Sequence, residues 1–90
     1  MNEVRRKAIA DVIEELDIIA GQMNSIASEI STIKDAEEEV LENMPEGLKE
    51  SEKGQLIQQA FERLEAAYDA ATTVNDGLLE ITDALTEAKS

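Results

Sequence analysis

The 90-residue sequence contains no cysteine, no histidine and no tryptophan. Without cysteine there is neither a disulfide framework nor a thiolate metal site. Without histidine the chain also lacks the usual general base at neutral pH and the commonest zinc ligand. No carboxylate falls in an EF-hand loop or a Glu-x-x-His motif. We therefore expect a protein that is not an enzyme and that carries no metal and no cofactor.

Aromatic residues are almost as scarce, and long apolar runs are absent. Phe61 and Tyr68 are the only aromatic residues, so the core must be aliphatic. No apolar run approaches the length of a membrane span, and no continuous apolar segment follows the charged N-terminus as it would in a signal peptide. We therefore expect a cytoplasmic protein that does not bind membranes.

Basic residues are few. Lysine and arginine number 8 against 21 aspartates and glutamates, which gives a formal charge of −13. Such a surface repels nucleic acid, so direct nucleic-acid binding is disfavoured. A hydrophobic content of 42% is too high for a disordered acidic tail. A basic protein partner, or mimicry of a polyanion, stays open.

Apolar residues recur every seven positions in the first half of the chain. The first series, at heptad position a, is Ile9, Leu16, Met23, Ile30 and Met44, interrupted by Glu37. The second series, at position d, is Val12, Ile19, Ile26, Ile33 and Val40. Ile13, Ala20, Ala27 and Leu41, at position e, widen the apolar stripe further. The pattern predicts a helix over residues 3–43 with a coiled-coil type of seam.

A second heptad pattern follows the only proline. Its a positions are Ile57, Leu64, Ala71, Leu78 and Leu85. Its d positions are Ala60, Ala67, Val74, Ile81 and Ala88. Pro45 and Gly47 indicate a turn over residues 44–51, and Ser51 is a suitable N-cap for a helix over residues 52–88. Asn2 is the corresponding cap for the first helix.

These elements predict an all-α fold, a single antiparallel helical hairpin over residues 1–90. Facing residues should have numbers that add up to roughly 95 to 98. One such hairpin buries only one side of each helix, which is too little to offset the entropy of ordering it. We therefore expect it to form a homodimer or a higher oligomer, most simply a dimeric four-helix bundle. The residues expected in the oligomer or partner seam are Ile9, Ile13, Leu16, Met23, Ile30, Leu64, Leu78 and Leu85.

Acidic side chains form a stripe on the second helix that has almost no basic neighbours. The stripe consists of Glu62, Glu65, Asp69, Asp76, Glu80, Asp83 and Glu87. Asp76 with Glu80 and Asp83 with Glu87 are like-charge pairs that weaken a helix slightly. The stripe is either a solvated face or the mimic of a polyanion.

Two further groups are candidate sites. Arg5, Arg6 and Lys7, which we expect near Lys89 at the end of the second helix, could bind a phosphate-bearing molecule if several copies converge. The expected pairing also brings one group to a single height, where it could dock another subunit or a target. That group is Ile18, Gly21, Asn75, Gly77 and Leu79.

The turn contains Asn43-Met44-Pro45-Glu46 and Ser51-Glu52-Lys53-Gly54, between a heptad helix and an alanine-rich acidic helix. In these residues it resembles the turn of a family of small bacterial and phage helical-hairpin proteins without an assigned activity. It implies a helical hairpin and is compatible with a phage origin. Secreted helical hairpins of this size carry a Trp-x-Gly turn, which this chain lacks.

Three functions follow as hypotheses. The first is an acidic binding protein that self-associates and blocks a partner, for instance a phage antagonist of a basic host defence protein. The second is an oligomeric sponge for a nucleotide or another small phosphorylated ligand. The third is a purely structural coiled-coil assembly module.

Overall fold

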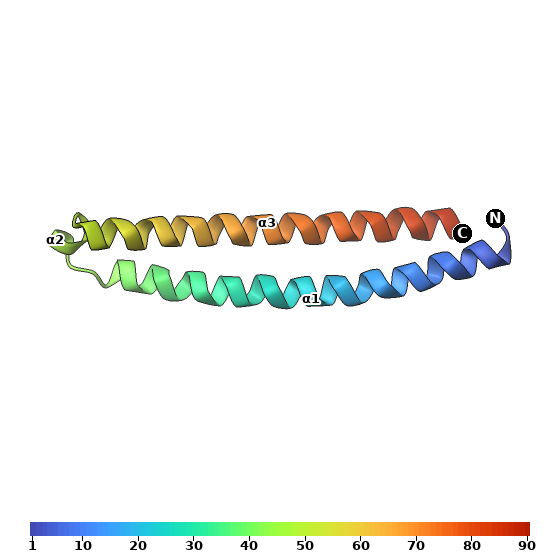
Figure 1. Ribbon diagram of the computed structural model, residues 1–90, viewed down its shortest axis with the longest axis horizontal. Coiled ribbons are helices and arrows are strands. Elements are labelled where there is room, and N and C mark those ends of the chain that lie inside the picture. Colours follow the sequence, from blue (N-terminus) through green and yellow to red (C-terminus); the bar gives the residue numbers. More distant parts are fainter.

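The computed structural model describes residues 1–90 and is 91% helical, with no strands. Helix α1 (Glu3–Glu42) and helix α3 (Glu52–Lys89) are joined by the short helix α2 (Glu46–Lys49) (Figure 1). The molecule is a rod of 68 × 15 × 14 Å. The all-α class expected from the sequence is confirmed.

Helices α1 and α3 lie side by side and run in opposite directions (Figure 1). The Asn75 side-chain amide donates a hydrogen bond of 2.9 Å to Asn24 Oδ1, and Lys34 Nζ lies 5.5 Å from the centre of the Tyr68 ring. The numbers of these facing residues add up to 99 and 102, a few more than expected. The difference arises at the connector, where α3 begins farther out than the end of α1.

The shifted pairing leaves the start of α1 without a facing partner. Figure 1 shows the first turns of α1, in blue, running past the end of α3, in red. We expected the N-terminal basic residues to lie level with the last turn of α3. They lie instead on turns of α1 that extend beyond it.

Both long helices begin at the residues that the sequence indicates. Asn2 Oδ1 accepts a hydrogen bond of 2.9 Å from the Arg5 backbone N–H, and Ser51 Oγ accepts one of 3.2 Å from the Gly54 N–H. These bonds satisfy backbone donors that have no partner within the helix. Helix α1 ends one residue before the expected boundary and α3 one residue beyond it.

Gly54 is buried against the connector. A Cβ atom on this residue would lie 2.6 Å from the Lys49 carbonyl oxygen and would also overlap the Leu48 carbonyl oxygen. Only glycine therefore lets the first turn of α3 lie against α2. The Leu48 side chain of α2 is exposed.

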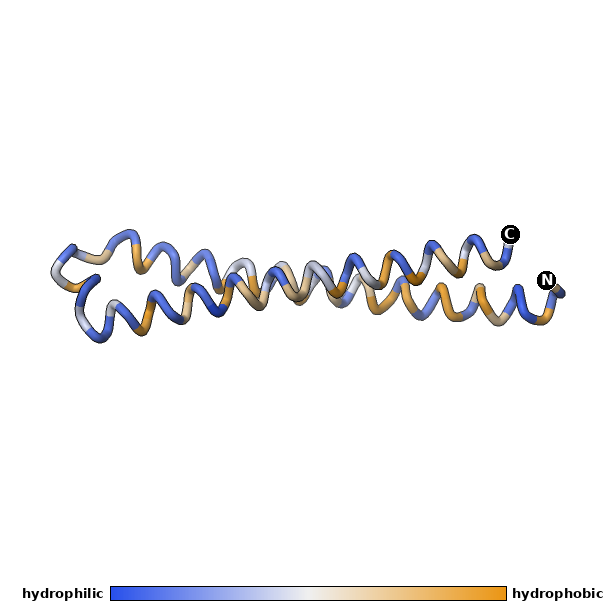
Figure 2. The backbone as a smooth tube through the Cα atoms, turned by 90° about the horizontal axis from the view of Figure 1, so that it is seen from above, coloured by the Kyte–Doolittle hydropathy of each residue, from blue (hydrophilic) through white to orange (hydrophobic).

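The interior of the molecule is thin. Only 3 of the 90 residues are buried, namely Ala27, Gly54 and Ala71. Apolar residues recur along the whole of both long helices, as the orange segments of Figure 2 show. No segment of α1, α2 or α3 combines the length and the hydropathy that a membrane-spanning helix needs.

Candidate partner-binding surfaces

The residues expected in the oligomer seam occupy the contact between α1 and α3. All eight are half-buried: Ile9, Ile13, Leu16, Met23, Ile30, Leu64, Leu78 and Leu85. They belong to positions a and e of the two heptad patterns. Positions a and e lie about 40° apart around a helix, so together they form one narrow contact line. This line is used within the chain.

The d positions of α1 form a second line, which α3 does not cover. Val12, Ile19, Ile26, Ile33 and Val40 are between 43% and 54% exposed. We call these five residues the β-branched stripe. Position d lies about 60° from a and 100° from e, which carries these side chains round to the flank of the helix pair. An apolar line of this length, along the larger part of α1, is typical of an interaction surface.

Helix α3 has its own exposed d positions beside the stripe. Val74 and Ile81 are each 49% exposed, and the remaining d positions, Ala60, Ala67 and Ala88, are small. Reversing a helix also reverses the direction in which its residues turn when both helices are viewed from one end. Because both helices use a and e for their contact, the two d lines fall on the same side of the pair. We call the β-branched stripe and these five residues the open face.

The sequence contained the open face, but periodicity alone assigned its residues to a single seam with the a positions. The signal that separates them is the pair of alanines at position e in the middle of α1. Ala20 and Ala27 at e are the small residues that allow the close approach of α3. The side of α1 that carries these small residues faces α3. Position d then lies on the flank of the helix pair.

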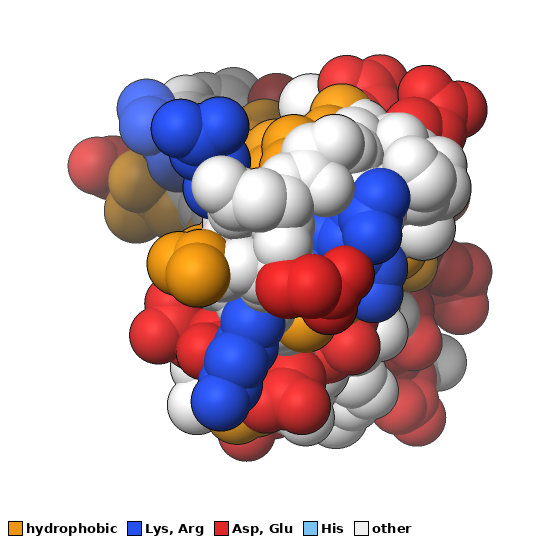
Figure 3. All heavy atoms as spheres, turned by 90° about the vertical axis from the view of Figure 1, so that its right-hand side faces the viewer, with side chains coloured by type: hydrophobic (Ala, Val, Ile, Leu, Met, Phe, Trp, Pro, Cys, Tyr) orange, Lys and Arg blue, Asp and Glu red, His pale blue; other side chains and the backbone are white.

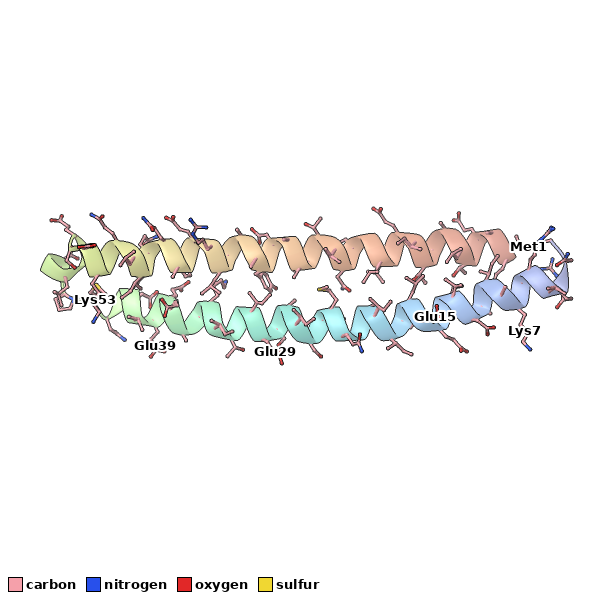
Figure 4. All side chains as sticks on the ribbon, viewed as in Figure 1. Met1, Lys7, Glu15, Glu29, Glu39 and Lys53 are labelled. Carbon is pink, nitrogen blue, oxygen red and sulfur yellow. The ribbon has the colours of Figure 1, made fainter.

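The acidic stripe of α3 is fully solvated. Every member is exposed, and none forms an ion pair: Glu62, Glu65, Asp69, Asp76, Glu80, Asp83 and Glu87. Only Glu62 has a side-chain partner, accepting a hydrogen bond of 3.2 Å from Gln58 Nε2. These residues lie mainly at positions c and f, away from both the α1 contact and the open face. Acidic side chains also project from α1, where Glu29 points away from α3 (Figure 4).

The basic residues of the N-terminus are spread around the overhanging turns of α1. Arg6 forms an ion pair of 2.9 Å with Glu3, while Arg5 and Lys7 form none. Lys7 points away from α3 (Figure 4). Viewed along the rod from this end, the blue side chains are separate, with red carboxylates between them (Figure 3). Within one chain the structure does not converge Arg5, Arg6, Lys7 and Lys89 on one point.

The group expected at one height (Ile18, Gly21, Asn75, Gly77 and Leu79) includes one polar contact between the helices. The hydrogen bond between Asn24 and Asn75 is the only side-chain hydrogen bond between α1 and α3. No atom of the other helix lies within 4 Å of a Cβ built on Gly21 or on Gly77, so neither glycine marks a close approach. Ile18 and Leu79 are exposed. Their heptad positions, c on α1 and b on α3, do not belong to the open face.

A groove of about 540 Å³ lies beside the connector. Its walls are mostly polar, with Leu41 as the one hydrophobic residue among Leu41, Glu42, Lys49, Gly54, Gln55, Gln58, Gln59 and Glu62. The charged residues of the groove, Glu42, Lys49 and Glu62, are all exposed. No group of three or more carboxylates is arranged to hold a metal ion.

Comparisons with protein-family models, with curated proteins and with solved structures found no match for this chain.

Proposed function

We propose that this chain is a non-catalytic binding protein whose helical hairpin self-associates into a bundle and captures a basic protein through its acidic outer surface. The observation that carries the proposal is the pairing of an uncovered apolar face with an unpaired acidic face on one rod. The apolar face supports assembly and the acidic face supports recognition.

The uncovered apolar face bears on the stability of the helix pair. With 3 of 90 residues buried, the isolated pair has almost no interior to offset the conformational entropy of ordering its residues. The β-branched stripe has the spacing that helices use to contact another helix, and it is left in solvent. Covering it in an oligomer supplies the missing apolar burial.

The acidic stripe indicates the charge of the partner. Repulsion between Asp76 and Glu80, and between Asp83 and Glu87, weakens the helix by a few tenths of a kcal/mol for each pair. Neither pair has a basic neighbour in ion-pair distance. A basic protein would relieve this repulsion on binding, and the field of a net charge of −13 would accelerate the encounter. An antagonist that occupies the nucleic-acid site of a basic bacterial protein fits this chemistry.

Affinity capture tests this function directly. The protein is immobilised, incubated with a bacterial lysate, and eluted with rising sodium chloride. We expect a basic protein that elutes by moderate salt and that Asp76→Asn with Asp83→Asn no longer retains. The matched control is Asp11→Asn with Asp17→Asn, which removes the same charge from α1. Capture by the α3 variant at wild-type strength would reject recognition through the acidic stripe.

A second candidate function, a sponge for a phosphorylated small molecule, is favoured by one observation. Arg6 Nε is buried without a hydrogen-bond partner at the N-terminal end, where Arg5 and Lys7 are free of ion pairs. Guanidinium groups bind phosphate by paired hydrogen bonds. This function requires copies of the N-terminal turns to converge in the oligomer.

A thermal-shift series tests the second candidate, with inorganic phosphate, mononucleotides and dinucleotides as the added probes. Specific binding raises the melting temperature with ligand concentration. The rise should disappear in Arg5→Ala with Arg6→Ala and persist in the control Lys53→Ala, which removes a basic residue near the connector. An equal rise in the arginine variant would reject this site.

A further inference from the structure

We infer that two copies of this chain pair through the open face in antiparallel orientation, about a twofold axis that passes at the level of Ile26 and Val74. This inference rests on the self-association proposed above and adds to it a specific surface, a partner and an orientation. The partner is a second copy of this chain.

The exposed area is the first argument. The chain exposes 6494 Å². A folded monomer of 9.9 kDa is expected to expose about 5,200 Å², so this chain exposes about 1,300 Å² more than its mass requires. A standard protein interface covers about 800 Å² on each partner, and obligate homodimers cover more. The surplus therefore matches what one stable homodimer interface removes from solvent.

The symmetry of the β-branched stripe is the second argument. Read in either direction, the stripe has the order valine, three isoleucines, valine, with Ile26 at its centre. A twofold axis at Ile26 places Val12 opposite Val40 of the other copy, and Ile19 opposite Ile33. Residues of the same shape then meet in one layer after another, as a self-complementary interface requires.

Helix α3 has its symmetry point at the same level of the rod. Ile26 lies two residues after Asn24, and Val74 lies one residue before Asn75 on the antiparallel helix, so the Asn24–Asn75 hydrogen bond makes Ile26 and Val74 level within one residue. A twofold axis through Ile26 and Val74 places Val74 opposite Val74 of the other copy, and Ile81 opposite Ala67 of the other copy. One axis therefore serves both helices, which is not a consequence of the hairpin itself.

Charge distribution selects the antiparallel orientation. Three of the chain's basic residues, Arg5, Arg6 and Lys7, lie on the turns of α1 that overhang α3. Residues 37–53 around the connector contain seven glutamates and two lysines. The axis at Ile26 brings each basic overhang beside the connector of the other copy, with Arg6 level with Glu46. A parallel pair would instead place two acidic connectors side by side.

The parallel arrangement also predicts different neighbours. It would lay α1 of one copy over α3 of the other, with Ile26 facing Val74, and would bring the N-terminal basic turns of both copies together. That is the convergence that the phosphate-ligand function requires, so the orientation of the dimer also separates the two candidate functions.

Disulfide trapping distinguishes the arrangements cleanly because the chain has no native cysteine. Ile26→Cys is purified, oxidised under mild conditions and analysed on a non-reducing gel. The antiparallel dimer predicts that most of the protein becomes covalently dimeric, since the two introduced sulfurs meet on the axis. The matched control Ile18→Cys replaces an isoleucine that is 64% exposed but lies off the open face, and it should stay largely monomeric on the gel.

A mixture experiment confirms the direction. Val12→Cys mixed with Val40→Cys should give crosslinked heterodimers, and neither variant should crosslink alone. The inference is overturned if Ile26→Cys crosslinks no better than Ile18→Cys. It is also overturned if Ile26→Cys crosslinks instead with Val74→Cys of another copy, which is the parallel arrangement.

Light scattering on the unmodified protein separates this failure from that of the proposed function. A dimeric mass without the Ile26 crosslink would reject the antiparallel pairing through the open face, while self-association would stand. A monomeric mass at high concentration would reject both.

A charge exchange tests the contact between the ends. Arg5→Glu with Arg6→Glu should weaken dimerisation about tenfold at low salt. Adding Glu46→Lys with Glu50→Lys to the same chain should restore it, since both ends of the contact are then reversed. No recovery would contradict the antiparallel pairing of overhang and connector.

Discussion

The Asn75 side-chain amide donates a 2.9 Å hydrogen bond to Asn24 Oδ1 between α3 and α1, and Asn75 Oδ1 is buried without a partner. A polar pair in a helix–helix seam lowers stability relative to apolar residues but favours one register, because any slip leaves both amides without partners. This pair therefore sets the alignment of α1 against α3, and with it the level at which Ile26 and Val74 meet.

The asparagine pair yields the first prediction. Asn24→Ala should lower the free energy of unfolding by about 1 kcal/mol, because the Asn75 amide loses its partner. The double variant Asn24→Leu with Asn75→Leu should be at least as stable as the native chain, since both polar groups are removed together. Urea unfolding monitored by circular dichroism measures both. A double variant less stable than the single one would show that the pair contributes more than register.

The second prediction concerns Gly54. Gly54→Ala should reduce the free energy of unfolding by about 1–3 kcal/mol, because the added methyl group overlaps the backbone carbonyls of Leu48 and Lys49 and the connector must shift. Gly21→Ala is the matched control. No atom lies within 4 Å of a Cβ there, so this change should stabilise the protein by up to about 1 kcal/mol through helix propensity. Thermal melts of the two variants should therefore move in opposite directions, and equal shifts would contradict the close approach at Gly54.

The third prediction concerns the cap of α3. Ser51 Oγ accepts the Gly54 N–H and also donates to the Leu48 carbonyl oxygen, so one hydroxyl joins α3 to α2. Ser51→Ala should cost about 1 kcal/mol of stability. Ser51→Thr keeps the hydroxyl and should stay close to the native value. Chemical denaturation compares the two, and an alanine variant as stable as the threonine variant would argue against the cap.

The fourth prediction concerns salt. The chain has a formal charge of −13 and only three ion pairs, so repulsion between carboxylates dominates its electrostatics. Raising sodium chloride from low to moderate concentration screens that repulsion and should raise the melting temperature. Asp76→Asn with Asp83→Asn should melt higher at low salt and respond less to added salt. A melting temperature that falls with salt would mean that attractive ion pairs outweigh the repulsion.

Local signals in the sequence predicted the helices well. Asn2 and Ser51 are short polar side chains whose oxygens bond to free backbone donors, and Pro45 cannot continue a helix. These effects act within one turn of the chain, so neighbouring residues suffice to locate the boundaries. The scarcity of Gly and Pro inside the two heptad segments completes the prediction of long helices.

The surfaces were predicted less well, because heptad periodicity gives the width of an apolar stripe and not the direction of its centre. Ile30 and Ile33 belong to the same stripe in the sequence, yet Ile30 is half-buried and Ile33 is 54% exposed. The choice between them depends on how closely the alanines let α3 approach, which is a property of two helices together. The pairing register likewise depends on how far beyond the end of α1 the connector places the start of α3.

The sequence by itself determined that this protein is two long acidic helices joined at a proline-containing turn, since helix propensity, capping and apolar period are written in neighbouring residues. Only the tertiary structure decided which apolar line is used within the chain and which is left open. The physical reason is that the a and e positions, with Ala20, Ala27 and Ala71 at the middle of the rod, form the contact between α1 and α3, and this contact turns the d positions of both helices to one uncovered side.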